Sequence, residues 1–117
     1  MTGLHWAARE GHANLCRLLT QRYHSNCHAK DCYGRTPLHL AVENKNIECI
    51  IRIFIEGGQL SSINKGGKTV RNVAKDAYVK YLIEKLEEIK FVIRTKKYEN
   101  PQDRKNDLEQ AIRSTLD

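Results

Sequence analysis

The 117-residue sequence lacks the features by which several classes of protein are recognised. No run of apolar residues approaches the roughly 20 that are needed to span a bilayer. The first residues, MTGLHWAARE, contain no basic stretch followed by an apolar core, so we expect no secretory signal. No Asn-x-Ser/Thr sequence occurs, so an acceptor for N-glycosylation is missing. These absences favour an intracellular protein, either cytoplasmic or nuclear.

Motifs of nucleotide binding and of nucleophilic catalysis are missing as well. Neither G-x-x-x-x-G-K-[ST] nor G-x-G-x-x-G occurs, and the stretch GGQLSSINKGGKT has the residue types of a phosphate loop without its spacing. A cysteine–histidine pair would need a positioned base and an oxyanion pocket, and the sequence offers no Gly-rich elbow or companion acid for either. We therefore predict a protein that is not an enzyme and that needs no cofactor.

The spacing of the cysteines matches neither a disulfide framework nor a zinc site. The four cysteines are unevenly spaced, which indicates free thiols (Cys16, Cys27, Cys32 and Cys49). Cys27, His28 and Cys32, with His24 nearby, have the residue types of zinc ligands. Structural zinc sites usually use two regularly spaced ligand pairs, and no second pair is present here. We predict that the protein binds no metal.

What the sequence does contain is a repeat. Residues 2–12 read TGLHWAAREGH and residues 36–46 read TPLHLAVENKN, so that both share T-x-L-H-x-A at a distance of 34 residues. A weaker copy begins at Thr69, 33 residues further on, in TVRNVAKD. An apolar run follows each strong copy, and a polar stretch with a glycine precedes the next threonine. A period of about 33 residues, with two short helices and a hairpin-like turn, is typical of a solenoid.

The T-P-L-H-x-A signature and this period resemble the ankyrin repeat. The resemblance covers roughly residues 2–83 and implies an all-α fold, a short helical solenoid with capping helices at its C-terminal end. The three expected units are residues 2–35, residues 36–68 and a degenerate third unit at residues 69–83. The resemblance also implies non-catalytic recognition of a protein partner through a concave face, which turn tips and the first helix of each unit form.

The physical roles of the signature residues are plain. Thr36 is suited to cap a helix, and Pro37 at the first helical position gives up only an N–H that had no partner. Gly34 supplies the backbone freedom of a tight turn. By resemblance, His5 and His39 hydrogen-bond in the network that joins one unit to the next. Arg52 departs from the pattern, because the family usually has a buried leucine there.

The resemblance predicts the binding residues by position. Trp6 and Tyr33 are the strongest candidates for interface hot spots, since large aromatic side chains dominate interface energetics. The others come from the turn tips and the inner helices. The complete set is Trp6, Arg9, Glu10, Lys30, Cys32, Tyr33, Arg35, Glu43, Asn44, Lys65 and Lys68.

The repeat pattern changes at Ala77. Val79, Leu82, Leu86, Ile89 and Ile93 follow at helical spacing and predict a long helix with one apolar stripe. A break at YENPQD predicts the start of a last helix, which Asn100 caps and whose first residue is Pro101. We expect residues 84–117 to form a helical extension that packs on the last unit.

Other partners and arrangements stay open. The net charge is +6, and residues 89–105 contain six Lys or Arg against two acids, which permits binding of nucleic acid or another acidic ligand by the C-terminal helices. The pattern favours a protein partner over nucleic acid or a membrane. The apolar face of the first unit (Leu4, Ala7, Leu15 and Leu18) has no unit before it, which predicts either weak self-association or a fragment of a longer array.

Overall fold

The computed structural model describes residues 2–22 and 26–116, and all regular structure in these ranges is helical. This confirms the predicted all-α class. The helices are α1 (Gly3–Glu10), α2 (Ala13–Gln21), α3 (Pro37–Glu43), α4 (Ile47–Ile55), α5 (Val70–Val73), α6 (Ala77–Arg94) and α7 (Pro101–Leu116).

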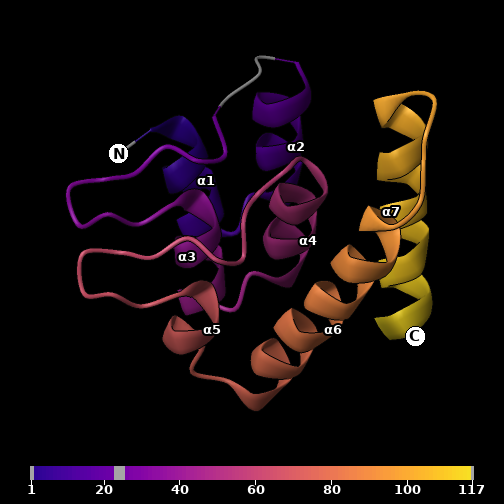
Figure 1. Ribbon diagram of the computed structural model, residues 1–117. Helices are drawn as coiled ribbons and strands as arrows, with labels where there is room; N and C mark the ends of the chain where they lie inside the picture. Colours follow the sequence, from indigo (N-terminus) through magenta and orange to yellow (C-terminus); the bar gives the residue numbers. More distant parts are fainter. Residues whose placement is uncertain (1, 23–25, 117) are drawn as a thin grey trace.

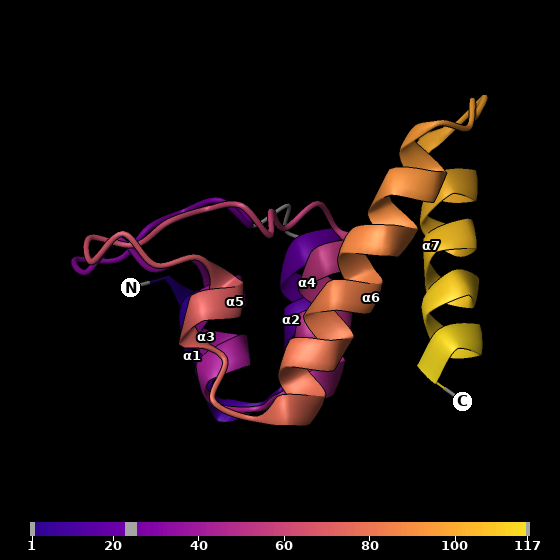
Figure 2. The same cartoon turned by 60° about the horizontal axis from the view of Figure 1, so that its bottom comes forward.

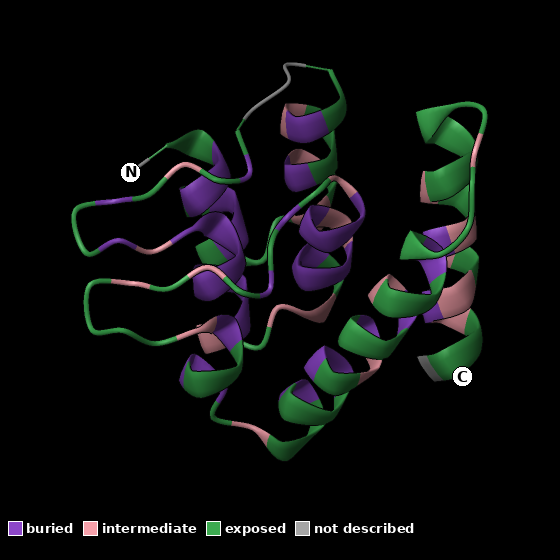
Figure 3. Cartoon of the chain, in the orientation of Figure 1, coloured by how far each residue is buried: buried purple, intermediate pink, exposed green. Residues whose placement is uncertain are grey.

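The helices stand in two rows, with α7 outside them (Figure 1). Helices α1, α3 and α5 form the inner row, in which each contacts the next. Helices α2, α4 and α6 form the outer row, and the buried residues lie mainly where the rows face each other (Figure 3). Two extended loops project beyond the inner row on one side (Figure 2). The first loop joins α2 to α3, and the second loop joins α4 to α5. This is the predicted solenoid, with its turns on the side of the inner helices.

The three inner helices begin in the same way. Thr2, Thr36 and Thr69 each accept a hydrogen bond from the backbone N–H three residues later, and the side chain of that later residue accepts from the threonine N–H. Reciprocal caps of this kind satisfy two backbone donors that a helix start leaves without partners. The predicted cap at Thr36 is confirmed. Gly3, in the place of Pro37, leaves the cap of α1 intact.

The two histidines of the signature join neighbouring units, as predicted. Nε2 of His5 donates to the carbonyl oxygen of Arg35 at 2.8 Å, and Nε2 of His39 donates to that of Lys68 at 3.1 Å. Nδ1 of each ring accepts from the backbone N–H of its capping threonine, at 3.2 Å for His5 and 3.3 Å for His39. Both rings are fully buried, and these bonds use Nε2 as the donor and Nδ1 as the acceptor.

The two turns stack on each other at residues 31–35 and 64–68. Each is closed by a backbone bond between its first and last residues, and the N–H of Lys65 donates to the carbonyl oxygen of Tyr33 at 3.0 Å. Gly34 has a φ of 74°, and a Cβ there would lie 2.8 Å from the backbone nitrogen of Lys65. Both the left-handed backbone and the close contact therefore require glycine.

Helix α6 contains the predicted apolar stripe, all of which is buried (Val79, Leu82, Leu86, Ile89 and Ile93). It runs without interruption from Ala77 to Arg94, so residue 83, at which the pattern ends the third unit, lies inside one helix. The division of the chain at that residue stays a prediction. The first helix of this unit, α5, has only four residues.

Helix α7 contacts both α6 and α4, so it lies against the second unit as well as the helix before it. The predicted cap is confirmed, because Oδ1 of Asn100 accepts from the N–H of Asp103 at 2.9 Å. The sequence of α4 explains the contact. Ile51 and Ile55 are buried, whereas the corresponding residues of α2, Arg17 and Gln21, are exposed.

Charged pairs frame this contact between α4 and α7. Arg52 forms an ion pair with Glu109, Glu48 accepts two bonds from Arg113 at 2.8 and 2.9 Å, and Lys105 contacts Glu56 at 2.7 Å. The bonds from Arg113 hold the pKa of Glu48 below its usual value. Residues 48, 52 and 56 lie one helical turn apart, on the face of α4 that also contains Ile51 and Ile55. Arg52 replaces a buried leucine because this face meets α7.

Candidate functional site

The first turn is built around the carboxylate of Asp31. Its Oδ1 accepts the N–H groups of Tyr33 and Arg35, both at 2.9 Å, and its Oδ2 accepts from Nε of Arg35 at 2.8 Å. Burial opposes the charged form of Asp31, but the two N–H groups and the guanidinium outweigh it and hold its pKa below the usual value. The turn is therefore fixed before any partner arrives.

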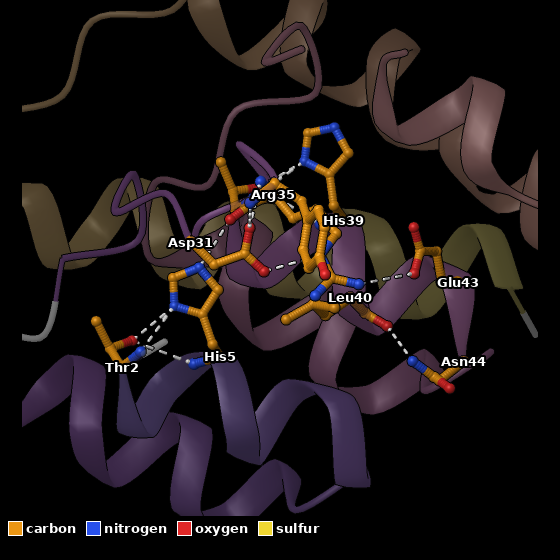
Figure 4. Close-up of polar contacts among 10 residues, drawn as sticks. Thr2, His5, Asp31, Arg35, His39, Leu40, Glu43 and Asn44 are labelled. Carbon is orange, nitrogen blue, oxygen red and sulfur yellow. Dashed lines mark hydrogen bonds and ion pairs between the residues drawn. The ribbon is translucent and has the colours of Figure 1, made fainter. Parts of the chain in front are cut away.

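Arg35 connects this turn to the inner helix α3 (Figure 4). Its guanidinium also lies 3.9 Å from the carboxylate of Glu43 and 5.0 Å from the centre of the Tyr33 ring. Tyr33 itself is 63% exposed. The structure thus brings together three of the predicted binding residues, Tyr33, Arg35 and Glu43, in one connected group. An aromatic ring held in this way loses little conformational freedom when it is covered.

The remaining predicted residues of the turns surround this group. Lys30 donates from Nζ to the carbonyl oxygen of Ile63 at 3.2 Å, which ties the first loop to the second. Cys32, Lys65 and Lys68 are exposed at the turn tips. The turn side of the molecule is therefore mainly cationic, and an acidic partner surface would complement it.

The predicted residues of the inner helices lie at their C-terminal ends. Nδ2 of Asn44 donates to the carbonyl oxygen of Leu40 at 2.9 Å. Arg9 and Glu10 form an exposed ion pair with each other at 3.1 Å. Such surface pairs contribute little to stability, so these side chains are available to a partner at small cost.

Trp6 is at the other end of the inner row from α5. It corresponds to Leu40 in the next unit, which is 1% exposed, whereas Trp6 is 42% exposed with its ring 5.0 Å from that of His12. In the described part of the chain, no unit lies on the outer side of α1. Trp6 is therefore exposed because no described unit covers α1, and the geometry does not join it to the group around Tyr33.

The predicted uncovered face of the first unit is smaller than the sequence indicates. Leu4 and Ala7 are fully buried, because α1 packs against α2 and α3, and Leu15 is half-buried. For Leu4 and Ala7 the prediction is wrong. Leu18, 40% exposed, is the part of this face that remains open. The predicted self-association then depends on Leu18 and Trp6.

Ile63 is a candidate that position alone could have identified. It is 51% exposed and occupies in the second loop the place that Lys30 has in the first, one repeat period earlier. The carbonyl of Ile63 receives the bond from Lys30, so the two side chains flank the stacked turns. The sequence does not predict Ile63 as a binding residue, because an isolated apolar residue in a loop usually packs inward.

The cysteines and histidines do not converge. Cys27 is buried, with its thiol facing the carbonyl oxygen of Glu56 at 3.8 Å, whereas Cys32 is exposed at the turn tip. Burial raises the pKa of Cys27, which disfavours the thiolate that metal binding requires. Among the described residues, no group of three or more possible ligands is close enough to hold a metal ion. His24, the fourth residue of the constellation, lies outside the described residues.

Basic residues of 89–105 line separate hollows, and Arg104 shares a small one with Lys90. Lys90 and Arg94 lie on the side of α6 that faces the second loop, and Lys96 lines a groove between α6 and α7 that also contains Asp107. Lys105 is paired with Glu56. No described helix has the length and apolar character needed to cross a membrane.

Comparisons with known proteins agree with this geometry. The family model of ankyrin repeats, in three copies, matches residues 4–95. A homolog of transient receptor potential cation channel subfamily A member 1 from Caenorhabditis elegans is 33% identical over 86 residues, which cover 70% of this chain and 7% of that protein. The chain thus spans only a small part of this relative. Its signature residues, its stacked turns and the match over most of its length lead to one conclusion: the chain belongs to the ankyrin-repeat family.

Proposed function

We propose that the protein is a non-catalytic recognition module that binds a protein partner through the concave side of its repeats. Ankyrin repeats are generally protein-interaction modules. The observation that supports this surface best is the exposed Tyr33, which stacks on an Arg35 already fixed by Asp31 and Glu43. Aromatic and arginine side chains held in this way are typical hot spots.

The proposed surface consists of the turn tips and the inner helices. Tyr33 and Arg35 are its centre, and cations and polar groups surround them. Trp6, on α1, is a second anchor. The surrounding residues are Arg9, Glu10, Lys30, Cys32, Glu43, Asn44, Lys65 and Lys68. The excess of cations at the turns favours a partner with an acidic surface.

An intracellular location belongs to the same proposal. All four cysteines are unpaired, and Cys16, Cys27 and Cys49 are buried as thiols. Unpaired thiols persist in the reducing compartments of the cell, the cytosol and the nucleus.

The test compares two surfaces of the same chain against a partner recovered by affinity capture. We expect Tyr33→Ala to weaken binding at least tenfold, or by about 1.4 kcal/mol. Tyr33 is exposed, and circular dichroism checks that the variant remains folded. Charge reversal at Lys96 and Lys97, on the far side of the molecule from the turns, should change affinity by less than about twofold. A loss seen only in the Lys96 and Lys97 variant, with a weaker salt dependence, would mean that the basic C-terminal helices are the site.

A further inference from the structure

A second surface, distinct from the concave side, has the composition of an anion-binding site. A hollow of about 400 Å³ lies between the second loop, the start of α5 and the C-terminal half of α6. Arg71 comes from α5, and Lys90 and Arg94 come from α6. One carboxylate, that of Glu87, also lines the hollow.

Two of these cations, Lys90 and Arg94, have no ion-pair partner among the described residues. Lys90 and Arg94 are one helical turn apart, a spacing at which like charges destabilise a helix. No carboxylate of the described residues forms an ion pair with either of them, whereas Arg71 is paired with Glu84. An anion bound between Lys90 and Arg94 would remove this repulsion.

The charge of the hollow favours a phosphate ester. Arg71 is paired with Glu84, so Lys90 and Arg94 are the two cations left to an anion, and a phosphorylated side chain has a charge of about −1.5 to −2 at neutral pH. Ser61 adds a hydroxyl that makes no hydrogen bond within the described structure. The hydroxyl of Thr69, by contrast, already donates to Asn72 and is not available.

An apolar surface adjoins the cations. Phe91 is 70% exposed on the rim, with Leu60 beside it in the hollow. A nucleic acid would need cations along a track of several phosphates. Here Lys90, Arg94 and Arg71 form one cluster with Glu84 and Glu87 beside it. Arg104 shares a smaller hollow with Lys90, and Lys105 is paired with Glu56. The surface fits a single anion next to an apolar side chain, as in a peptide.

We propose that this hollow binds a phosphorylated serine or threonine of a protein partner, with Lys90, Arg94 and Arg71 contacting the phosphate and Phe91 contacting an apolar neighbour. The proposal is independent of the concave surface, since it uses other residues. If the Tyr33 experiment fails, this one is unaffected.

The experiment is an NMR titration of the full chain with short synthetic peptides. One contains phosphoserine flanked by leucine, one has phosphoserine flanked by glycine, and one has unmodified serine flanked by leucine. We expect the leucine-flanked phosphopeptide to shift the side-chain signals of Arg71 and Arg94 and to bind about tenfold more tightly than the unmodified peptide. Equal binding of these two peptides would overturn the proposal.

Two pairs of variants separate this site from a general attraction of charge. Lys90→Gln with Arg94→Gln should weaken binding of the phosphopeptide about tenfold. Lys80→Gln with Lys97→Gln removes the same charge from exposed positions outside the hollow. This pair should change the affinity for the phosphopeptide by less than about twofold. An equal loss in both pairs would overturn the proposal, as would a short thymidine oligonucleotide that binds more tightly than the phosphopeptide.

Phe91→Ala tests the apolar contact. It should weaken binding of the leucine-flanked phosphopeptide only, and an equal loss of affinity for the glycine-flanked phosphopeptide would exclude the contact.

Discussion

Replacing Ile112 of α7 by alanine is expected to lower the free energy of unfolding by about 3 kcal/mol. Ile112 is fully buried, and with Leu108 it forms the apolar centre of α7, a helix that is otherwise mostly exposed. The helix covers the face of α4 that contains Ile51 and Ile55. Truncation of a buried isoleucine removes its own contacts and leaves a cavity where the helices meet. Urea denaturation monitored by circular dichroism measures the change.

The matched control is Gln110→Ala on the exposed side of the same helix, which should alter stability by no more than about 0.5 kcal/mol. The ion pairs around the contact cannot replace Ile112, because pairs near the surface typically contribute at most about 1 kcal/mol each. If Ile112→Ala and Gln110→Ala had equal effects, α7 would not be packed on the repeats.

The second large effect is expected for His39→Leu, which should reduce stability by about 2–4 kcal/mol. The substitution removes the donor to the carbonyl oxygen of Lys68, a partly buried bond, and the acceptor for the N–H of Thr36, a buried bond. Each buried polar group left without a partner costs about 1–3 kcal/mol. His28→Leu is the control, since His28 is exposed, and it should change stability by less than about 0.5 kcal/mol. A small effect of His39→Leu would mean that the bond between units is dispensable.

The same histidine predicts a dependence of stability on pH. Burial lowers the pKa of His39, because the folded structure favours the neutral ring. The unfolded chain therefore binds more protons below a pH of about 6.5, and stability is lost as the pH falls through that value. We expect His39→Leu to remove this part of the dependence, so that its deficit is smaller at low pH. A deficit that is constant between neutral and acidic pH would contradict the assignment.

Local features of this fold are predictable from sequence because they depend on residues close together in the chain. Thr36, Pro37 and Gly34 specify a helix start and a turn by their own backbone chemistry, and all three are found in these roles. The histidine bonds between units follow from the repeat period.

Long-range contacts are less predictable. The position of α7 on α4 depends on Ile51 and Ile55. These residues indicate a second covered face of α4 only when α4 is compared with α2, which is polar at the same positions. The pairing of Arg52 with Glu109 joins residues 57 positions apart, which no local pattern indicates. The burial of Leu4 and Ala7 depends on α2 and α3, and no pattern within α1 itself indicates these contacts. The hollow at Lys90 and Arg94 combines three separate segments.

The concave surface is tested most directly by hydrogen exchange of the backbone amides, with and without the recovered protein partner. We predict that binding slows exchange at the turns, residues 31–35 and 64–68, and at the C-terminal ends of α1 and α3, where Arg9, Glu10, Glu43 and Asn44 lie. Protection confined to α6 and α7, with exchange at the two turns unchanged, would contradict binding at the concave surface.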